Sequence, residues 1–270
     1  MKTIKTFAIA AAFLALTVSA SEAAAPLRVC FDDHDAPRSM KDGGKGFDVE
    51  IMTLVAHKIG RTLEPVWIET EPGMTEVDDS DLPLEPLAKG QCDAVASVPG
   101  DMALQGLHDK LALTQPYYGA AFELVGPDSL PNNLASLKKI KISVQNVSLA
   151  NLVMARLDYD WTAQTTAKAQ LAALDSGEAK AALIWGPSLG EFGRKPKAGF
   201  VPPSIFRWNE HVAIRKSDDA LRKEIDGALA ELVASDKVKD ILIKYGVPPH
   251  GAFAKVFSPQ DLTTIRLTRN

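Results

Sequence analysis

Short apolar runs alternate with helix-like segments in the first hundred residues, and this alternation limits the possible folds more than any other feature. Residues 27–31 and 63–68 are predicted strands, and residues 47–59 carry apolar side chains at helical spacing. Residues 83–89 are a predicted short helix before a third strand at 93–98. Strands that alternate with helices predict a parallel sheet covered by helices, and therefore an α/β fold.

A second series of strands and helices begins after Tyr118. The predicted strands are 121–125, 140–144, 181–185 and 211–215, and the predicted helices are 149–157, 168–176, 187–192, 218–234 and 237–245. The chain therefore contains two similar α/β units, and its last predicted strand and helices return to the first unit.

The first 25 residues are typical of an export signal. Lys2 and Lys5 precede an apolar stretch at 7–18, and Ala23 and Ala25 form a small-residue cleavage site. A retained membrane anchor is the alternative, but about a dozen apolar residues are fewer than the roughly 20 that span a bilayer. We predict cleavage, export to the periplasm and no membrane contact of the mature chain.

The charge balance argues against nucleic acid as a partner. The chain has 30 Lys and Arg against 34 Asp and Glu, a net charge of −4. Nucleic-acid binding depends on clustered basic residues that neutralise phosphates. Such clusters are not expected in a mildly acidic protein.

Cys30 and Cys92 are the two cysteines of the chain. An even count in an exported protein favours a disulfide. On neighbouring parallel strands, however, the two would be offset by about three residues at roughly 3.3 Å each, and a disulfide tolerates a Cα separation below about 7 Å. A disulfide and two buried free thiols both remain open.

Motifs spread over residues 27–247 resemble the family 3 solute-binding proteins of the periplasm. They are Leu27-Arg28-Val29, Gly46-Phe47-Asp48-Val49-Glu50, Gly90-x-Cys92-Asp93, Pro116-Tyr117-Tyr118, Ser136-Leu137-Lys138, Leu174-x-x-Gly177 and Tyr245-Gly246. The resemblance implies a two-lobed α/β periplasmic-binding-protein fold of type II, each lobe a central mixed sheet flanked by helices. Lobe 1 would contain residues 26–120 and 212–250, lobe 2 residues 121–211 with the hinge crossings, and residues 251–270 a tail packed on a lobe.

Three features that hold amino acids in this family are missing from the chain. The arginine expected eight or nine residues before Pro116 is replaced by Leu107 or His108. The aspartate after the fifth strand is replaced by Trp185 or Gly186, and the Gly-Thr-Thr turn by residues 145–148. A zwitterion would leave its two charges without partners, so tight binding of free amino acids is not expected. A neutral or aromatic solute, stacked on tryptophan, is the alternative.

A second set of motifs is similar to the MxaJ and XoxJ accessory proteins of methanol oxidation, a subfamily encoded beside quinoprotein dehydrogenases. The matching residues are Arg28-Val29-Cys30 with Asp32, Gly46-Phe47-Asp48 with Ile51, Trp67, Cys92-Asp93 with Val98-Pro99, and Thr114-Gln115-Pro116-Tyr117-Tyr118. The chain departs from the subfamily at Pro37-Arg38-Ser39, where many members have Pro-Phe-Ser, and at Gln115, where many have arginine.

This resemblance implies a non-catalytic accessory protein without a cofactor. It would assist assembly, maturation or activation of a PQQ-dependent methanol dehydrogenase through protein contact. The partners would be the large subunit of the dehydrogenase and its cytochrome c. The alternative function is the substrate-binding component of an ABC transporter for a small organic solute other than a free amino acid. The predicted cleft offers no convincing acid/base pair, so catalysis is not expected.

Eight polar or aromatic residues are candidates for the cleft wall: Asp32, His34, Arg38, Ser97, Gln145, Asn146, Trp185 and Trp208. The run from Asp32 to Asp35 could in principle hold a metal ion, but consecutive residues point in alternate directions, so we interpret it as a solvated loop and expect no metal site. An acidic segment between the second and third strands is either a solvated loop or a docking surface for a basic partner. Its residues include Glu69, Glu71, Glu76, Asp78, Asp79 and Asp81.

Overall fold

The computed structural model describes residues 24–69, 82–104, 106–261 and 263. The strands are β1 (Leu27–Asp32), β2 (His34–Asp35), β3 (Ser39–Met40), β4 (Leu63–Ile68), β5 (Ala94–Val98), β6 (Leu111–Leu113), β7 (Tyr118–Val125), β8 (Ile142–Gln145), β9 (Trp161–Gln164), β10 (Ala181–Trp185) and β11 (Arg207–Arg215). The helices are α1 (Phe47–Lys58), α2 (Leu84–Ala88), α3 (Leu149–Arg156), α4 (Ala167–Asp175), α5 (Leu189–Phe192), α6 (Asp219–Ala234) and α7 (Lys237–Lys244). The predicted export signal and most of the acidic segment lie outside the described residues.

One twisted sheet runs through the molecule in the order β4-β1-β5-β11-β7-β10-β8-β9, with β6 also paired to β11. The strands at each end of the sheet pair in parallel: β4 with β1 and β1 with β5 at one end, and β10 with β8 and β8 with β9 at the other. In the middle, β11 pairs antiparallel with β5, and β7 pairs antiparallel with β10. The predicted α/β fold with mixed sheets flanked by helices is therefore confirmed. The two mixed halves are joined into a single sheet through β7 and β11.

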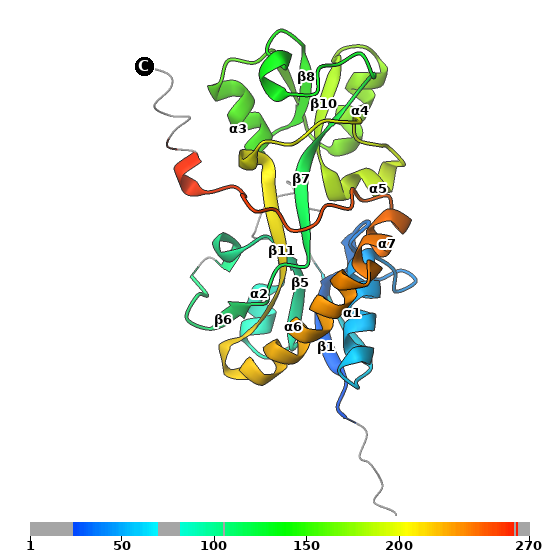
Figure 1. Cartoon of the computed structure of the whole chain (residues 1–270), viewed down its shortest axis with the longest axis vertical. Helices are drawn as coiled ribbons and strands as arrows, with labels where there is room; N and C mark the ends of the chain where they lie inside the picture. The colour runs from blue at the N-terminus through cyan, green and yellow to red at the C-terminus, as the bar shows by residue number, and fades with distance from the viewer. Residues whose placement is uncertain (1–23, 70–81, 105, 262, 264–270) are drawn as a thin grey trace, which may run out of the picture.

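The strands β7 and β11 connect the two halves of the molecule, which are seen above and below the middle in Figure 1. They pair with each other from Tyr118↔Glu210 to Ala121↔Arg207. Both are longer than the sequence predicts, because the crossing segments themselves are extended and hydrogen-bonded. The short strands β6 and β9 were not predicted.

Helix α1 shows how the apolar spacing produces the fold. Its side chains Phe47, Ile51, Met52 and Val55 are fully buried, and they recur at the three- and four-residue intervals that place them on one helical face. The helix ends before Gly60, whose φ of +73° is readily adopted by glycine. Helix α1 packs against α6 and α7, as the lower half of Figure 1 shows. None of the helices among the described residues has the length and apolar character needed to cross a membrane.

The segment after α7 crosses the middle of the molecule, where it is drawn in red over β7 and β11 in Figure 1. The backbone N–H of Gly119 donates to the carbonyl of His250, and the N–H of Phe257 donates to the carbonyl of Arg207. Phe253 lies in the space left by the missing side chain of Gly119, where a side-chain carbon would be 2.6 Å from the ring. The sequence predicts a tail packed on a lobe, and the described part lies on the two crossing strands.

Candidate binding cleft

A cavity of about 390 Å³ lies between the loop after β1, the end of β5 and the start of α5. Its wall also includes Asp48 at the start of α1, Glu210 on β11 and Trp185 at the end of β10. The carboxyl ends of strands are the usual ligand site in open α/β sheets. The cavity therefore marks the candidate binding cleft.

A buried hydrogen-bond cluster forms the floor of the cleft around Asp48, which is 4% exposed. The Ser97 hydroxyl donates to Asp48 Oδ1 at 2.8 Å, and the Tyr117 hydroxyl donates to the same oxygen at 3.1 Å. Ser97 has a left-handed φ of +51°, which is uncommon outside glycine and concentrates at functional sites. Burial raises the pKa of Asp48 to about 7, although the bond from Ser97 and the charge of Arg38 act in the opposite direction.

Arg38 is held by an ion pair with Asp35, with 2.5 Å between Nε and Oδ2. Gly46 allows this arrangement, because a side-chain carbon there would lie 2.0 Å from the Arg38 carbonyl oxygen. Burial lowers the pKa of Arg38, but the negative charge of Asp35, followed by Tyr118, Asp48 and Glu210, outweighs burial and raises the pKa above its ordinary value. The guanidinium is therefore already paired with a carboxylate of the protein.

The structure brings five of the eight predicted wall residues to the cavity: Asp32, His34, Arg38, Ser97 and Trp185. Trp208 instead packs edge-on against Trp185, with 5.3 Å between ring centroids, and against Phe257 of the tail at 5.6 Å. Gln145 is buried at the end of β8 and Asn146 is exposed after it, and neither lines the cavity.

The three positions that bind the amino-acid ligand in the family do not offer equivalent side chains here. Leu107 is buried in an apolar cluster, and His108 is exposed with its Nε2 2.9 Å from the Asp101 carbonyl oxygen. At Gly186 a side-chain carbon would lie 2.8 Å from the carbonyl oxygen of Ala121, so an aspartate does not fit without movement of the backbone. The absence of the family's ligand-binding side chains is therefore seen in the packing of these positions as well as in the sequence.

The eight predicted wall residues omit four acidic residues of the cavity wall: Asp35, Asp48, Glu191 and Glu210. Asp48 belongs to a recognised motif, but its direction toward the cleft is not readable from the motif. Glu210 is 1% exposed and lies on the part of β11 that precedes the predicted strand, so its place on the buried face with Trp208 and Val212 was hidden. The crossing segment around Glu210 also contains Arg207, Asn209 and His211, so no signal in the sequence singles out Glu210 as a wall residue.

Cys30 and Cys92 form a disulfide with a Cα separation of 5.6 Å, which resolves the two alternatives. The register pairs Cys30 with Val95, three residues beyond Cys92, so a straight strand would hold the two cysteines too far apart. Cys92 instead precedes β5, where the chain bends and the Asp93 N–H donates to the Arg28 carbonyl.

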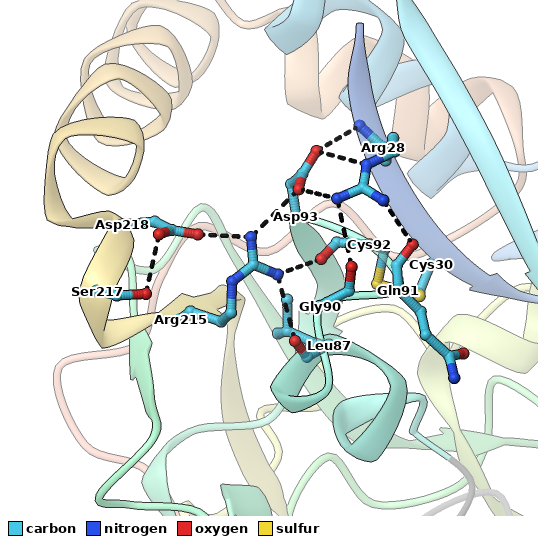
Figure 2. Close-up of polar contacts among 10 residues, drawn as sticks. All are labelled: Arg28, Cys30, Leu87, Gly90, Gln91, Cys92, Asp93, Arg215, Ser217 and Asp218. Carbon is cyan, nitrogen blue, oxygen red and sulfur yellow. Dashed lines mark hydrogen bonds and ion pairs between the residues drawn. A yellow bond between two sulfur atoms is a disulfide. The ribbon is translucent and has the colours of Figure 1, made fainter.

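Figure 2 shows the polar network beside this disulfide, with Asp93 between two guanidinium groups. Arg28 donates to Asp93 Oδ1 at 2.7 Å, and Arg215 donates to the same oxygen at 3.2 Å. Arg215 also donates to the Cys92 carbonyl, and Arg28 to that of Gln91. Because these bonds fix the chain before β5, the network is structural and lies outside the cavity wall.

Two other predicted features have limited structural counterparts. Glu69 is exposed after β4, and the remaining named residues of the acidic segment lie outside the described residues. Within the described part of the chain, no group of three or more His, Cys, Asp and Glu side chains is arranged to hold a metal ion.

Comparison with known proteins places this fold in a family. The family model of bacterial extracellular solute-binding proteins, family 3, matches residues 27–248. The protein MoxJ from Methylorubrum extorquens is 26% identical, over 86% of this chain and 85% of its own. This relative agrees with the MxaJ-type resemblance predicted from the motifs.

Solved structures with the same fold include both MxaJ and a solute receptor. MxaJ from Methlophaga aminisulfidivorans has a TM-score of 0.63 and 22% identity, covering 83% of this chain and 99% of that one. The unliganded, open L-cystine solute receptor of Neisseria gonorrhoeae has a TM-score of 0.67 and 21% identity, covering 84% and 96%. The fold, the cleft and the family match agree: the chain belongs to the bacterial extracellular solute-binding proteins, family 3.

Proposed function

We propose that the protein is a non-catalytic periplasmic accessory of a PQQ-dependent methanol dehydrogenase. It would assist assembly, maturation or activation by contact with the large subunit, with the cytochrome c of the system as a further partner. The MxaJ-type motifs and the similarity to MoxJ support this proposal. The extracellular family and the predicted export signal support a periplasmic location.

The observation that carries the proposal is which side chains line the cleft and how they are paired. Arg38 is the one Arg or Lys among the described residues that line the cavity, and it is paired with Asp35. Of the two positions that could correspond to the missing aspartate, Trp185 carries an indole, and at Gly186 an added side-chain carbon would lie 2.8 Å from the carbonyl oxygen of Ala121. A cleft whose lining arginine is already paired offers no free cation to the carboxylate of an amino acid, and this favours a segment of another protein as its occupant.

The test is to mix the purified mature protein with the dehydrogenase large subunit at low salt. Complex formation by analytical ultracentrifugation and dye-linked dehydrogenase activity would be followed together. We expect a complex and a change in activity or in recovery of active enzyme. No complex and no effect on activity would contradict the proposal.

A thermal-shift screen provides the comparison with transport. A small solute that raises the melting temperature by several degrees and binds with micromolar affinity would favour a transport receptor instead. We expect no such solute, because the cleft has lost the groups that confer tight binding in the family.

A further inference from the structure

We propose that the two halves of the molecule are locked together, so that the cleft keeps one width and binds its occupant without hinged closure. The lock consists of two contacts: a seam between α5 and the end of α7, and the C-terminal segment that crosses β7 and β11. The inference goes beyond the proposed function, because it concerns the free protein and does not depend on which partner fills the cleft.

The seam is a direct backbone contact between the two halves. Helix α5 belongs to the half that contains β8 and β10, and it lies next to the end of α7 near the middle of the molecule (Figure 1). A side-chain carbon on Gly190 of α5 would overlap the carbonyl oxygen of Tyr245, the residue that follows α7. A side-chain carbon on Gly246 would lie 3.0 Å from the Cα of Gly190. Two glycines therefore allow the backbones to touch with no side chain between them.

Each side of the seam is anchored in its own half. Leu189 of α5 is 0% exposed and packs in the apolar cluster that contains Ile184 of β10. On the other side, the Tyr245 ring lies edge-on to Phe47 of α1, with 6.4 Å between the ring centroids. Neither side can shift alone. A rotation of the halves would therefore press backbone on backbone or open a void at the seam, and a packed interior resists both changes.

The C-terminal segment ties the halves together at a second place. The Phe253 ring fills the space beside Gly119 of β7 and lies 5.0 Å from the guanidinium of Arg207 on β11. The Phe257 ring lies 5.6 Å from the ring of Trp208, also on β11. Hinged closure requires changes of backbone angle in the strands that join two lobes. Here aromatic side chains of the C-terminal segment cover those strands and hold them in place.

The seam and the crossing segment belong to one continuous stretch, residues 245–257, so closure would have to disturb both. A small solute that relies on closure to be enclosed gains little from a cleft of fixed width. A polypeptide segment that fits the cleft as it stands would bind without the free-energy cost of a conformational change. The lock therefore favours an occupant that fills the open cleft.

The test measures the distance between the halves in the free, full mature protein by double electron–electron resonance. Both native cysteines form the disulfide, so nitroxide labels can be attached to Lys139→Cys and Lys237→Cys, at exposed positions on the two halves. Lys139→Cys with Lys168→Cys is the matched control pair, because both labels then lie on the same half. We expect a single distance population that is no broader than that of the control pair. Two populations, or a clearly broader one, would overturn the inference.

Two variants loosen the lock at separate places. Gly190→Ala puts a methyl group against the carbonyl oxygen of Tyr245, and Phe253→Ala removes the ring beside Gly119. We expect each variant to shift or broaden the distance between the halves, and the double variant to do so most. Gly227→Ala on α6 is the control, because an added carbon there would meet nothing within 4 Å, and it should leave the distance unchanged.

An unchanged distance distribution in a double variant that is folded by circular dichroism, or an equal change in Gly227→Ala, would contradict the lock. If Gly190→Ala does not fold, the width in the native protein and the effect of Phe253→Ala decide the question. The measurement needs no dehydrogenase, so a failure of complex formation would refute the accessory role and leave the lock standing.

Discussion

His250 Nε2 lies 2.6 Å from Oε1 of Glu123, and this contact fastens the C-terminal segment to β7. Glu123 is 2% exposed, so the pair is shielded on the carboxylate side. The same segment is fastened to β11 through Asn209, whose amide donates to the Phe253 carbonyl at 3.0 Å and accepts from the Phe253 N–H at 2.7 Å. Closure of two lobes around a ligand bends the strands that join them. A segment bound to both strands would therefore oppose such a closure in this chain.

The first prediction concerns this segment. Asn209→Ala removes both bonds to Phe253, and we expect a loss of about 2 kcal/mol in local stability and faster amide exchange in residues 118–125 and 207–215. Hydrogen-exchange mass spectrometry measures this directly. Asn133→Ala is the matched control, because Asn133 also makes two local hydrogen bonds, to Ser136, away from the crossing strands. Unchanged exchange in β7 and β11 of Asn209→Ala would contradict the role of the tail.

The second prediction concerns Asp93, which is 15% exposed and paired with Arg28 and Arg215. Burial alone would raise its pKa, but hydrogen bonds from the two arginines outweigh burial and lower the pKa below its ordinary value. Asp93→Asn should reduce the free energy of unfolding by about 2 kcal/mol near neutral pH, because it removes the carboxylate that Arg28 and Arg215 share, while Arg215 keeps its ion pair with Asp218.

The pH dependence gives the control for this variant. A carboxylate with a lowered folded-state pKa stabilises the fold above its unfolded-state pKa, and this contribution is lost as pH falls. The deficit of Asp93→Asn in urea unfolding should therefore shrink toward pH 3. Asp219→Asn breaks pairs with Arg222 and Lys223 on a side chain that is 50% exposed, and should reduce stability clearly less than Asp93→Asn because solvent screens the exposed pairs. Equal losses of unfolding free energy in the two variants would show that the Asp93 network stabilises the fold no more than an exposed ion pair does.

Strand and helix periodicity predicted most elements of this fold, because buried faces impose a pattern on the sequence. Periodicity failed at the start of β11, where the strand continues through Trp208 and Glu210 and the residues are buried by the tail and the opposite lobe. The direction of Asp48 into the cleft depends on the left-handed turn at Ser97 and on Tyr117, which are distant in sequence. The disulfide was left open because the bend at Cys92 cannot be inferred from a straight-strand register.

The third prediction concerns the Cys30–Cys92 disulfide, which spans 62 residues of sequence. Closing a loop of that length restricts the unfolded chain, and the loop-entropy relation gives a stabilisation of about 4 kcal/mol. The Cys30→Ala, Cys92→Ala double variant should therefore unfold at a lower urea concentration than the oxidised protein. Dithiothreitol should reduce the midpoint of the native protein and leave that of the variant unchanged. If neither the double substitution nor dithiothreitol changes the urea midpoint, the disulfide does not stabilise the fold.

The fourth prediction concerns Asp48, whose pKa burial raises to about 7. A folded-state pKa above the unfolded value means that the folded protein holds the proton more tightly, so this group favours folding at low pH and its contribution is lost as pH rises toward 7. The shift from about 3.8 corresponds to at most about 4 kcal/mol. Asp48→Asn keeps acceptors for Ser97 and Tyr117 and does not ionise. In urea unfolding, native protein should lose stability relative to Asp48→Asn between pH 5 and pH 8. Parallel stability curves for the two proteins would mean that Asp48 does not titrate in this range.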